Sequence, residues 1–409
     1  MAKIDIVSEA YKRDPFPTLS RLVEQGPLVP HKIPFFGTIQ LVTTYDAALE
    51  LLKDSERFAV DGRNAGKSSQ FGMAWLPKSM KLLGENMLSH DDPTHRRLRK
   101  LVDGPFKTQE IEKLRPAVAR IADTLLDEVA ASDPPDLVGG FCRRLPLAVI
   151  CEMLGLPKED HPRFEAWMDT MSDVASGFGI FKIMPMIRKL SDYLREQFEL
   201  RRADPQPGLI TELIKVESEE DRLTEDELLA MVFVLLIAGH ETTTHLLSTS
   251  VETLMRHPET LDTLKADASL WPAFVEESLR YNSPVQMTKP RYAKTDLEFR
   301  GVPVKRGERF MAMLASANAD PARFDDPARF DITREKNRHL GFGGGMHLCL
   351  GLQLARMETQ AGLARLFERW PALRLAVPVD QLSWHKRLGM RGLKALPLVL
   401  DERAVPIAA

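Results

Sequence analysis

Apolar positions recur at helical spacing over most of the chain. Within 111–129 they step by three and four residues, which predicts an amphipathic helix. Two more helical patterns lie within 164–202, on either side of Gly177 and Gly179. A further helix is predicted over 271–282, where a Trp-Pro pair opens the pattern and Asn-Ser-Pro ends it. Helices therefore dominate the prediction.

The longest helix is predicted to begin after Thr224. Thr224 and Glu227 have the spacing of a capping box, and the helical pattern continues to about Arg256. At 1.5 Å per residue, about 33 residues give a helix ~50 Å long. Since its middle is apolar on nearly every side, we expect it to cross the centre of the fold. Its continuous apolar run, 228–238, is about half of the roughly 20 residues that a membrane helix needs, so no membrane span is expected.

Strand signals are short. The β-branched segment 38–44 predicts a strand, followed by a short helix over 46–53, and alternation over 297–313 predicts a β-meander. Residues 61–90 contain glycines without sustained periodicity and predict a long loop. Two identical hexapeptides, Asp-Pro-Ala-Arg-Phe-Asp, fill 320–331 and predict a winding loop. The pattern as a whole predicts a mostly α fold with small β-sheets (α+β).

Composition narrows the class of protein. The chain has 409 residues, a formal charge of −3 and three cysteines. No Ser/Gly-rich linker divides it, so residues 1–409 are expected to form a single domain. So few cysteines, and an N-terminus without a signal-peptide pattern, favour a cytoplasmic protein. The lack of a long basic block argues against nucleic-acid binding.

Candidate chemistry concentrates at Cys349. This residue follows three successive glycines, 343–345, and precedes an amphipathic helical pattern. Because a helix N-terminus favours an anion, we expect a depressed pKa for the Cys349 thiol and a role as thiolate ligand or nucleophile. The alternative is a small buried hydrophobic residue. Met346 stands where a dinucleotide-binding loop needs glycine, no Gly-Lys-Ser/Thr follows for a phosphate loop, and the cysteine spacing does not fit a zinc site. A single thiolate best suits an axial position on a haem iron.

One segment resembles the haem-ligand loop of the cytochrome P450 superfamily at every fixed position, namely Phe342-Gly343-x-Gly345-x-His347-x-Cys349-x-Gly351. The resemblance implies the family's single-domain fold, with a long central helix and a buried haem b. It also implies that Cys349 is the axial ligand of the haem iron. Phe342, Gly343, His347 and Gly351 of the segment are also expected to hold the cofactor.

The long helix carries a second resemblance. Its segment 238–243 is similar to the family's Ala-Gly-x-Asp/Glu-Thr-Thr/Ser motif. Gly239 costs a helix ~1 kcal/mol relative to alanine, and in the family it belongs, with Ala238, to a groove for dioxygen above the cofactor. Glu241 and Thr242 are then expected to be the catalytic pair that relays protons. The alternative for Thr242 is a hydrogen bond to a carbonyl of its own helix.

Glu277 and Arg280 match the family's Glu-x-x-Arg pair. From their spacing alone they form a surface ion pair that contributes less than ~1 kcal/mol. The resemblance implies instead a structural triad, buried with an arginine of a later loop. We expect that arginine to be Arg329, with Arg323 of the first hexapeptide as the competitor.

The two propionates of a haem need cationic partners. His95 and Arg99 lie four residues apart, and this spacing matches the family's propionate ligands. The alternative is a solvated basic helix. By the same resemblance, Arg291 and His347 complete the set. The other basic residues around His95, with Arg356, are expected to form a positive patch for a redox partner.

The resemblance implies a haem-thiolate monooxygenase that activates O₂ and hydroxylates or epoxidises a hydrophobic small molecule. The chain has no flavin-binding or nicotinamide-binding segment. Electrons are therefore expected from an iron–sulfur ferredoxin with its NAD(P)H-dependent ferredoxin reductase, and the enzyme is expected to be a monomer. A haem-thiolate peroxygenase or isomerase would not need the acid–alcohol pair, and a haem-based gas sensor or carrier would need an output segment, so these are weaker alternatives.

Apolar residues from several parts of the chain are expected to line the substrate pocket. A terpenoid, steroid, fatty or aromatic compound is consistent with them, and the sequence does not choose among these. The expected pocket residues are Phe71, Met73, Trp75, Leu82, Phe178, Phe181, Leu235, Val285, Met287, Leu388 and Met390.

Overall fold

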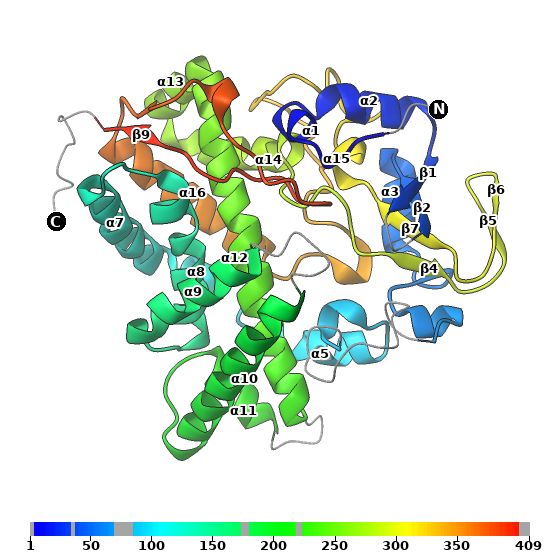
Figure 1. Cartoon of the computed structure of the whole chain (residues 1–409), viewed down its shortest axis with the longest axis horizontal. Coiled ribbons are helices and arrows are strands. Elements are labelled where there is room, and N and C mark those ends of the chain that lie inside the picture. Colours follow the sequence, from blue (N-terminus) through cyan, green and yellow to red (C-terminus); the bar gives the residue numbers. More distant parts are fainter. Residues whose placement is uncertain (1–3, 34–36, 69–84, 173–179, 218–222, 401–409) are drawn as a thin grey trace.

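A long central helix organises the molecule. The longest helix, α12 (Glu225–Arg256), crosses the middle of the fold (Figure 1). The Thr224 hydroxyl accepts a hydrogen bond from the Glu227 N–H at 3.2 Å, and the Glu227 carboxylate accepts one from the Thr224 N–H at 2.9 Å. The predicted start of this helix is therefore confirmed. The structure, a computed structural model, describes residues 4–33, 37–68, 85–172, 180–217 and 223–400.

Other helices pack around α12. The helices α8 (Arg144–Leu154), α14 (Trp271–Tyr281) and α16 (Leu352–Arg369) pack directly against it, and α7 (Arg115–Ala131) packs against α16. By length and composition alone, α12 could cross a membrane, but 67% of its most apolar window is buried inside this fold. Such burial is typical of a core helix, which agrees with the central position expected from the sequence.

The helix predicted over 111–129 is two helices, α6 (Thr108–Glu112) and α7. Helix α7 begins at Arg115 with a proline, Pro116, in its first turn. Because proline has no N–H to continue the hydrogen bonds of a preceding helix, the chain starts a new helix there. The apolar spacing continues through the break, so periodicity alone suggested one helix.

Some of the remaining helices pack against α12, and others pack elsewhere in the fold. The two helical patterns expected within 164–202 are confirmed as α9 (His161–Ser172) and α10 (Ile180–Ala203), which pack against each other. The further helices are α1 (Glu9–Arg13), α2 (Phe16–Glu24), α3 (Tyr45–Lys53), α5 (Thr94–Val102), α11 (Leu209–Glu217), α13 (Pro258–Ala266) and α15 (Leu314–Ala317).

A five-stranded sheet lies beside the helical part (Figure 1), in the order β1-β2-β7-β4-β3. The rings of Phe58, Phe299 and Phe310 pack edge to face with centroids 5.1–5.9 Å apart and form the centre of a second core. The strand predicted over 38–44 and the helix predicted over 46–53 are confirmed as β2 and α3. The strands are β1 (Leu28–Ile33), β2 (Gly37–Val42), β3 (Phe58–Ala59), β4 (Arg291–Ala293), β5 (Leu297–Phe299), β6 (Val302–Val304), β7 (Arg309–Ala312), β8 (Arg374–Leu375) and β9 (Leu398–Val399).

The meander predicted over 297–313 is wrong in its last strand. Strands β5 and β6 form a separate hairpin, and Arg300 and Gly301 make its turn at positive φ. Strand β7 lies instead between β2 and β4 in the larger sheet, where Phe310 is fully buried. Alternation identifies a strand but does not say which sheet it joins. The repeat at 320–331 contains neither helix nor strand, as predicted.

Candidate active site

The loop that carries Cys349 packs tightly against α3. Gly343 and Gly345 have φ values of +72° and +67°, in the backbone region that favours glycine. A Cβ atom on Gly345 would come within 2.0 Å of the Leu52 carbonyl oxygen. The Cys349 N–H donates to the Phe342 carbonyl at 3.1 Å and closes the loop. Glycine at position 345 is therefore a requirement of this close packing.

Cys349 lies just before α16, which begins at Leu352 with Gly351 as its N-cap residue. The depressed pKa expected for the thiol is wrong, because burial raises the pKa of Cys349 more than the Gly351 backbone and the charges of Arg99 and Arg356 lower it. The expectation counted the helix end but not the loss of water around an enclosed thiol. Coordination to a metal ion is the physical route to a thiolate at such a position.

A cavity of about 340 Å³ lies between this loop and α12. Its volume falls in the range of small-molecule sites. We call it the Cys349 cavity. All of the predicted cofactor residues, two of the predicted pocket residues and the predicted catalytic Thr242 line it: His95, Arg99, Leu235, Ala238, Gly239, Thr242, Val285, Arg291, Phe342, Gly343, His347, Cys349 and Gly351.

Basic side chains gather at this cavity. The rings of His95 and His347 lie 4.3 Å apart between centroids, and Arg291 and Lys289 are within electrostatic reach of His347. Among the residues that the structure describes, His95 Nε2 and both ring nitrogens of His347 are buried without a hydrogen-bond partner. Because buried polar atoms are nearly always hydrogen-bonded, these nitrogens indicate a polar ligand that the protein itself does not supply.

The electrostatics of these residues favour an anionic ligand. Burial, followed by the charges of the neighbouring basic residues, lowers the pKa of His347 to about 2. Burial also lowers the pKa of Arg291 to about 10 and that of Lys289 to about 8. Each shift shows that the surrounding protein disfavours the positive charge. Two carboxylates, such as the propionates of a haem, would offset this effect, so the residues present fit that group.

Arg99 has partners within the protein. Its Nη1 donates to the Leu348 carbonyl at 2.6 Å, and its Nε donates to Asp103 at 2.9 Å. Arg99 also lines the Cys349 cavity. These bonds join α5 to the Cys349 loop, so Arg99 helps to position the loop.

The positive patch expected around α5 is partly neutralised. Arg356 makes two hydrogen bonds with Glu276, at 2.6 and 2.8 Å. Arg97 pairs with Glu227 in the capping box of α12, and Arg96 pairs with a neighbouring carboxylate at 2.8 Å. The Arg96 side chain is nevertheless 82% exposed. The expectation that all these cations, Arg356 included, are free for a partner is therefore corrected.

Glu241 and Thr242 line different cavities. The Thr242 hydroxyl donates to the Ala238 carbonyl at 2.8 Å, and Thr242 lines the Cys349 cavity. Glu241 forms an ion pair with Arg387 and lines a second, smaller cavity. The structure thus shows the intrahelical hydrogen bond that was the alternative for Thr242, and it places the carboxylate on another face of α12.

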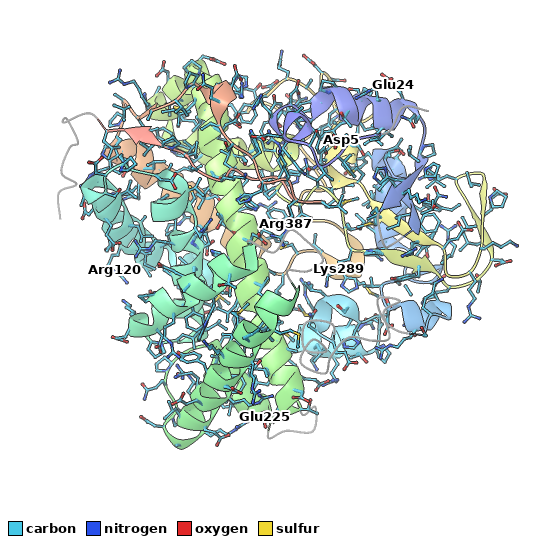
Figure 2. All side chains as sticks on the ribbon, viewed as in Figure 1. Asp5, Glu24, Arg120, Glu225, Lys289 and Arg387 are labelled. Atoms are coloured by element: carbon cyan, nitrogen blue, oxygen red, sulfur yellow. The ribbon has the colours of Figure 1, made fainter. Side chains whose placement is uncertain are left out.

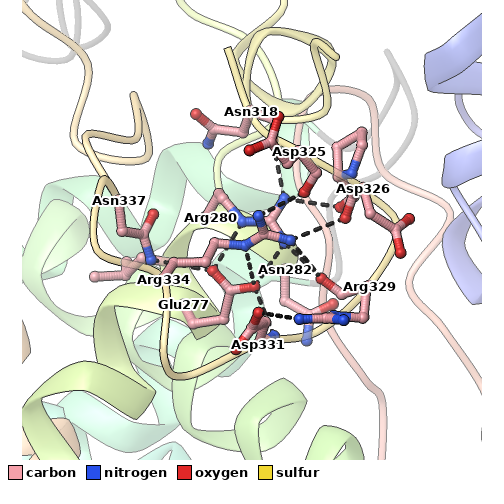
Figure 3. Close-up of polar contacts among 12 residues, drawn as sticks. Glu277, Arg280, Asn282, Asn318, Asp325, Asp326, Arg329, Asp331, Arg334 and Asn337 are labelled. Carbon is pink, nitrogen blue, oxygen red and sulfur yellow. Dashed lines mark hydrogen bonds and ion pairs between the residues drawn. The ribbon is translucent and has the colours of Figure 1, made fainter.

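Glu277 and Arg280 form the centre of a buried polar network (Figure 3). Both side chains are fully buried, and hydrogen bonds of 2.8 and 2.7 Å join them. The third member is Arg334, whose Nε donates to Glu277 at 3.1 Å. The Arg329 side chain is 65% exposed and pairs with Asp331, while its carbonyl accepts from Arg280 at 3.1 Å. The prediction of Arg329 as the third side chain is therefore wrong.

The repeated loop contributes backbone groups to this network instead of an arginine side chain. Arg280 Nη1 donates to the carbonyls of Asn318 and Pro327, at 3.0 and 2.8 Å. The N–H of Asp331 donates to Glu277 at 2.9 Å, and Asn337 Nδ2 donates to it at 3.0 Å. The competitor Arg323 lies over the ring of Tyr45, 4.9 Å from its centroid. The second arginine side chain that contacts Glu277 is Arg334, which follows the end of the repeated loop.

The structure places two of the predicted substrate-wall residues at the Cys349 cavity. Leu235 and Val285 line the Cys349 cavity, and Met390 pairs with Val285 through a backbone bridge. Met287 is instead buried in a core formed with the N-terminal segment, and Leu388 is 36% exposed, so both predictions are corrected. Leu388 lies in a turn with Gly389, whose φ is +74°, so its side chain faces solvent. The predictions for Phe71, Met73, Trp75, Leu82 and Phe178, and for the side chain of Phe181, lie outside the described residues.

Some residues of the cavity were not expected from the sequence. Lys289 lines it and donates to Ser89 at 3.3 Å. Its place two residues before Arg291 in an extended segment was a usable signal, because such residues share a face. Glu358 of α16 also lines the cavity, and burial raises the pKa of this carboxyl well above its usual value. No local pattern marked Glu358.

Comparison with known proteins assigns the chain to a family. Residues 35–375 match the cytochrome P450 family. The cytochrome P450 monooxygenase PikC of Streptomyces venezuelae is 36% identical over 96% of this chain and 92% of its own length. The vitamin D(3) 25-hydroxylase of Pseudonocardia autotrophica is 36% identical over 98% of this chain and 97% of its own. The solved structure of PksS, a cytochrome P450 of the Bacillus subtilis bacillaene polyketide synthase, is 34% identical, with a TM-score of 0.88 over 97% of this chain and 100% of that one.

The chain therefore belongs to the cytochrome P450 family. It is a monooxygenase, an oxidoreductase whose cofactor is haem. Its mostly helical fold with small sheets is the P450 fold.

Proposed function

We propose that this P450 holds haem b through Cys349 and inserts one atom of O₂ into a hydrophobic small molecule bound against α12. The observation that carries the proposal is the Cys349 cavity. It brings together the thiol of Cys349, the Ala238–Gly239 stretch of α12 and a group of basic residues that includes two histidines with unpartnered ring nitrogens among the described residues. Segments from Leu52 to Glu358 line this cavity, which supports a single catalytic domain formed by the whole chain.

Each group of residues has a separate role at the cofactor. When haem is bound, Cys349 would be its thiolate ligand, and His95, Arg291 and His347 would bind the propionates, with Lys289 as an added cation. When bound, haem supplies the iron at which dioxygen is activated. The small residues of α12 leave room for dioxygen and substrate, while the apolar walls exclude water from the reacting atoms.

Glu241 and Thr242 relay the protons that the reaction consumes. They are neighbours on α12, so one side chain faces the smaller cavity and the other faces the Cys349 cavity. A proton moves from the Glu241 side of the helix to the Thr242 hydroxyl. This hydroxyl gives up its hydrogen bond to the Ala238 carbonyl and donates into the Cys349 cavity.

The substrate we propose is a hydrophobic compound with a terpenoid, steroid, fatty or aromatic skeleton. The described walls are apolar at Ile150, Leu235, Leu246 and Val285. The names of the relatives mention vitamin D(3) and a polyketide synthase, and both point to large, mainly apolar carbon skeletons. A panel of such compounds, tested for shifts of the haem absorption band, would rank the skeletons by affinity.

The electron donor we propose is an iron–sulfur ferredoxin with an NAD(P)H-dependent reductase, acting on a monomer in the cytoplasm. The exposed cations of α5, including Arg96 and Lys100, remain available to an acidic partner. If this is right, the rate of reduction by ferredoxin falls steeply as ionic strength rises.

The central test is the absorption spectrum of the reduced, CO-bound protein. The wild-type protein is expected to show the red-shifted band of a thiolate-ligated haem, and Cys349→Ala is expected to lose it. A wild-type protein without this band would overturn the proposal.

For the relay, Thr242→Ala is expected to keep the band and NAD(P)H consumption but to divert electrons into peroxide. Unchanged product yield per NAD(P)H in this variant would reject the role of Thr242.

A further inference from the structure

A second cavity lies against α12 beside Glu241. Its volume is about 20 Å³, enough for one water molecule. It is lined by His240, Glu241 and His245 of α12, by Arg143, and by His385 and Arg387 of the segment that follows α16. We call it the histidine cavity. The roles assigned so far use only Glu241 among these residues.

Two nitrogen atoms at the histidine cavity lack hydrogen-bond partners. In the described part of the chain, His240 Nε2 and His245 Nδ1 are buried and unpartnered. His240 is 3% exposed and His245 is 5% exposed. A buried polar atom without a partner is costly, and the usual remedy in a cavity of this size is an ordered water. The two nitrogens therefore point to a water in the histidine cavity.

Both histidines are neutral near pH 7. Burial, followed by the charge of Arg143, lowers the pKa of His240 to about 4, although a hydrogen bond with the Arg143 backbone acts in the opposite direction. Burial, followed by the nearby His385, Arg387, His240 and Arg143, lowers the pKa of His245 to about 3. A neutral imidazole both donates and accepts, so it orients a water without taking its proton. Glu241 is the one carboxylate that lines the described cavity, so it is the place where a proton can settle.

Arg387 holds the Glu241 carboxylate at this cavity. The two side chains form an ion pair, and His245 Nε2 lies 3.9 Å from the same carboxylate oxygen. Figure 2 shows Arg387 beside the middle of α12. The Arg387 side chain is 37% exposed, whereas that of Glu241 is 17% exposed. Arg387, which lines the cavity, is thus partly exposed to solvent.

The segment that carries Arg387 is firmly packed on α12. The N–H of His385 donates to the Gly392 carbonyl at 3.0 Å, and Trp384 is bridged to Leu393. A Cβ atom on Gly392 would come within 1.9 Å of His245 Nδ1, so only glycine fits there. The positions of Arg387 and His245 are thus fixed relative to one another.

We propose that the histidine cavity is a water site that returns a proton to Glu241 during turnover, and that Arg387 is the positioning residue that keeps Glu241 at this water. The inference rests on the proposed role of Glu241 and Thr242. In the transfer, the water gives one proton to the Glu241 carboxylate and takes one from solvent on the Arg387 side. The net change is one proton moved from solvent to Glu241, and no electrons move.

The test compares four variants of the holoenzyme, all of which must keep the CO-bound thiolate band. His245→Phe removes the orphaned nitrogen and fills the cavity, Arg387→Met removes the positioning charge, and Arg387→Lys keeps it. Lys386→Met is the matched control, because Lys386 is next in the chain but its side chain is 61% exposed and points to Glu9 instead. The measurements are the product formed per NAD(P)H and the ratio of turnover rates in H₂O and D₂O.

We expect His245→Phe and Arg387→Met to lower the product formed per NAD(P)H at least threefold and to raise the solvent isotope effect. Arg387→Lys should recover most of the yield, and Lys386→Met should match the wild-type enzyme. A high-resolution crystal structure should show a water bonded to His240 Nε2 and His245 Nδ1 in the wild-type protein and none in His245→Phe. Wild-type coupling in both His245→Phe and Arg387→Met, or a dry cavity, would overturn the inference. If Thr242→Ala lowers the product formed per NAD(P)H while His245→Phe and Arg387→Met do not, the proposed water site is rejected and the relay through Thr242 is retained. If Thr242→Ala also keeps the wild-type yield, the relay itself is rejected.

Discussion

The Glu277 network and the Cys349 cavity both bury positively charged side chains, but the partners of these side chains differ between the two regions. In the network, Arg280 and Arg334 share one carboxylate and donate to several backbone carbonyls. At the cavity, Arg291 is 4% exposed, and His347 has two ring nitrogens without partners among the described residues. The charged side chains of the network therefore have their partners within the protein, whereas the ring nitrogens of His347 at the cavity have none among the described residues.

Whether a buried cation has a partner within the protein distinguishes structural cations from candidate ligand-binding cations. The sequence motifs do not make this distinction. Both groups belong to motifs of the same family, and both contain arginine deep in the fold. A buried cation that the protein already neutralises stabilises the fold in the absence of any ligand. A buried cation whose pKa is lowered by its surroundings, as that of Arg291 is, gains only when an anion arrives. The following predictions test this distinction.

The largest effect is expected for Glu277→Gln. This change leaves Arg280 and Arg334 buried without a countercharge, so the free energy of unfolding should fall by about 3–5 kcal/mol. Urea unfolding of the purified protein measures the loss, and haem content should fall with it. A variant that retains wild-type stability would show that the network is not the structural centre of this region.

A pair of arginine variants distinguishes side chain from backbone in the same network. Arg334→Met should cost about 2–4 kcal/mol, because its Nε bonds to the buried Glu277 and its side chain is only 10% exposed. Arg329→Met should cost less than about 1 kcal/mol, because it removes one exposed ion pair and leaves the Arg329 carbonyl in place. Parallel urea titrations give both values, and equal losses would restore Arg329 to the triad.

Arg291→Met should have opposite effects with and without cofactor. In the haem-free protein, it removes a buried charge that the surroundings disfavour, so stability should be unchanged or higher by about 1 kcal/mol. In the holoenzyme it removes a propionate partner, so transfer of haem to an acceptor protein should be about tenfold faster, equivalent to ~1.4 kcal/mol. Lower stability of the haem-free variant would place Arg291 among the structural cations.

The sequence predicted the parts of this molecule that depend on local pattern. The capping box at Thr224, the helix α14 and the glycine-rich Cys349 loop follow from residues close together in the chain. The errors arise where distant segments meet. Arg334 replaces Arg329 because the path of the repeated loop depends on backbone hydrogen bonds to Arg280, which no motif encodes. The same reason explains β7, whose alternation is strand-like but whose partners lie elsewhere in the chain.

The direction of the pKa shift of Cys349 is a second property that the sequence did not predict. A helix N-terminus lowers a thiol pKa, whereas burial raises it, and the sequence shows only the first effect. The separation of Glu241 from Thr242 is similar, since helical spacing places them side by side but does not reveal which cavity each one lines. Motifs therefore indicated the candidate residues, and tertiary packing determined their partners.

The last effect depends on pH and concerns Glu276, which is one residue before Glu277 in the chain. Burial alone would raise the pKa of Glu276, but hydrogen bonds from His339 and Arg356 outweigh burial and lower the pKa to about 2. In the unfolded chain the carboxyl has its ordinary pKa, so as pH falls from about 5 the unfolded state takes up the proton first. The stabilisation is thus complete above pH 5 and is lost as pH approaches 2. Because the side chain is 30% exposed, we expect a contribution of about 1–2 kcal/mol, below the full value of the shift.

Urea midpoints measured from pH 6 to pH 3 test this contribution of Glu276. Glu276→Gln should be less stable than wild type at pH 6 by about 1–2 kcal/mol, and the two proteins should converge towards pH 3, because only the wild-type carboxylate has a charge to lose. Arg356→Met should show the same convergence, since it removes a hydrogen-bond partner that keeps the pKa of Glu276 low. A constant difference at every pH would mean that Glu276 acts through packing and not through its charge. Convergence would show that Glu276 and Arg356 neutralise each other within the protein, as the charged residues of the Glu277 network do. This would hold even though Arg356 belongs to α16, the helix that follows Cys349.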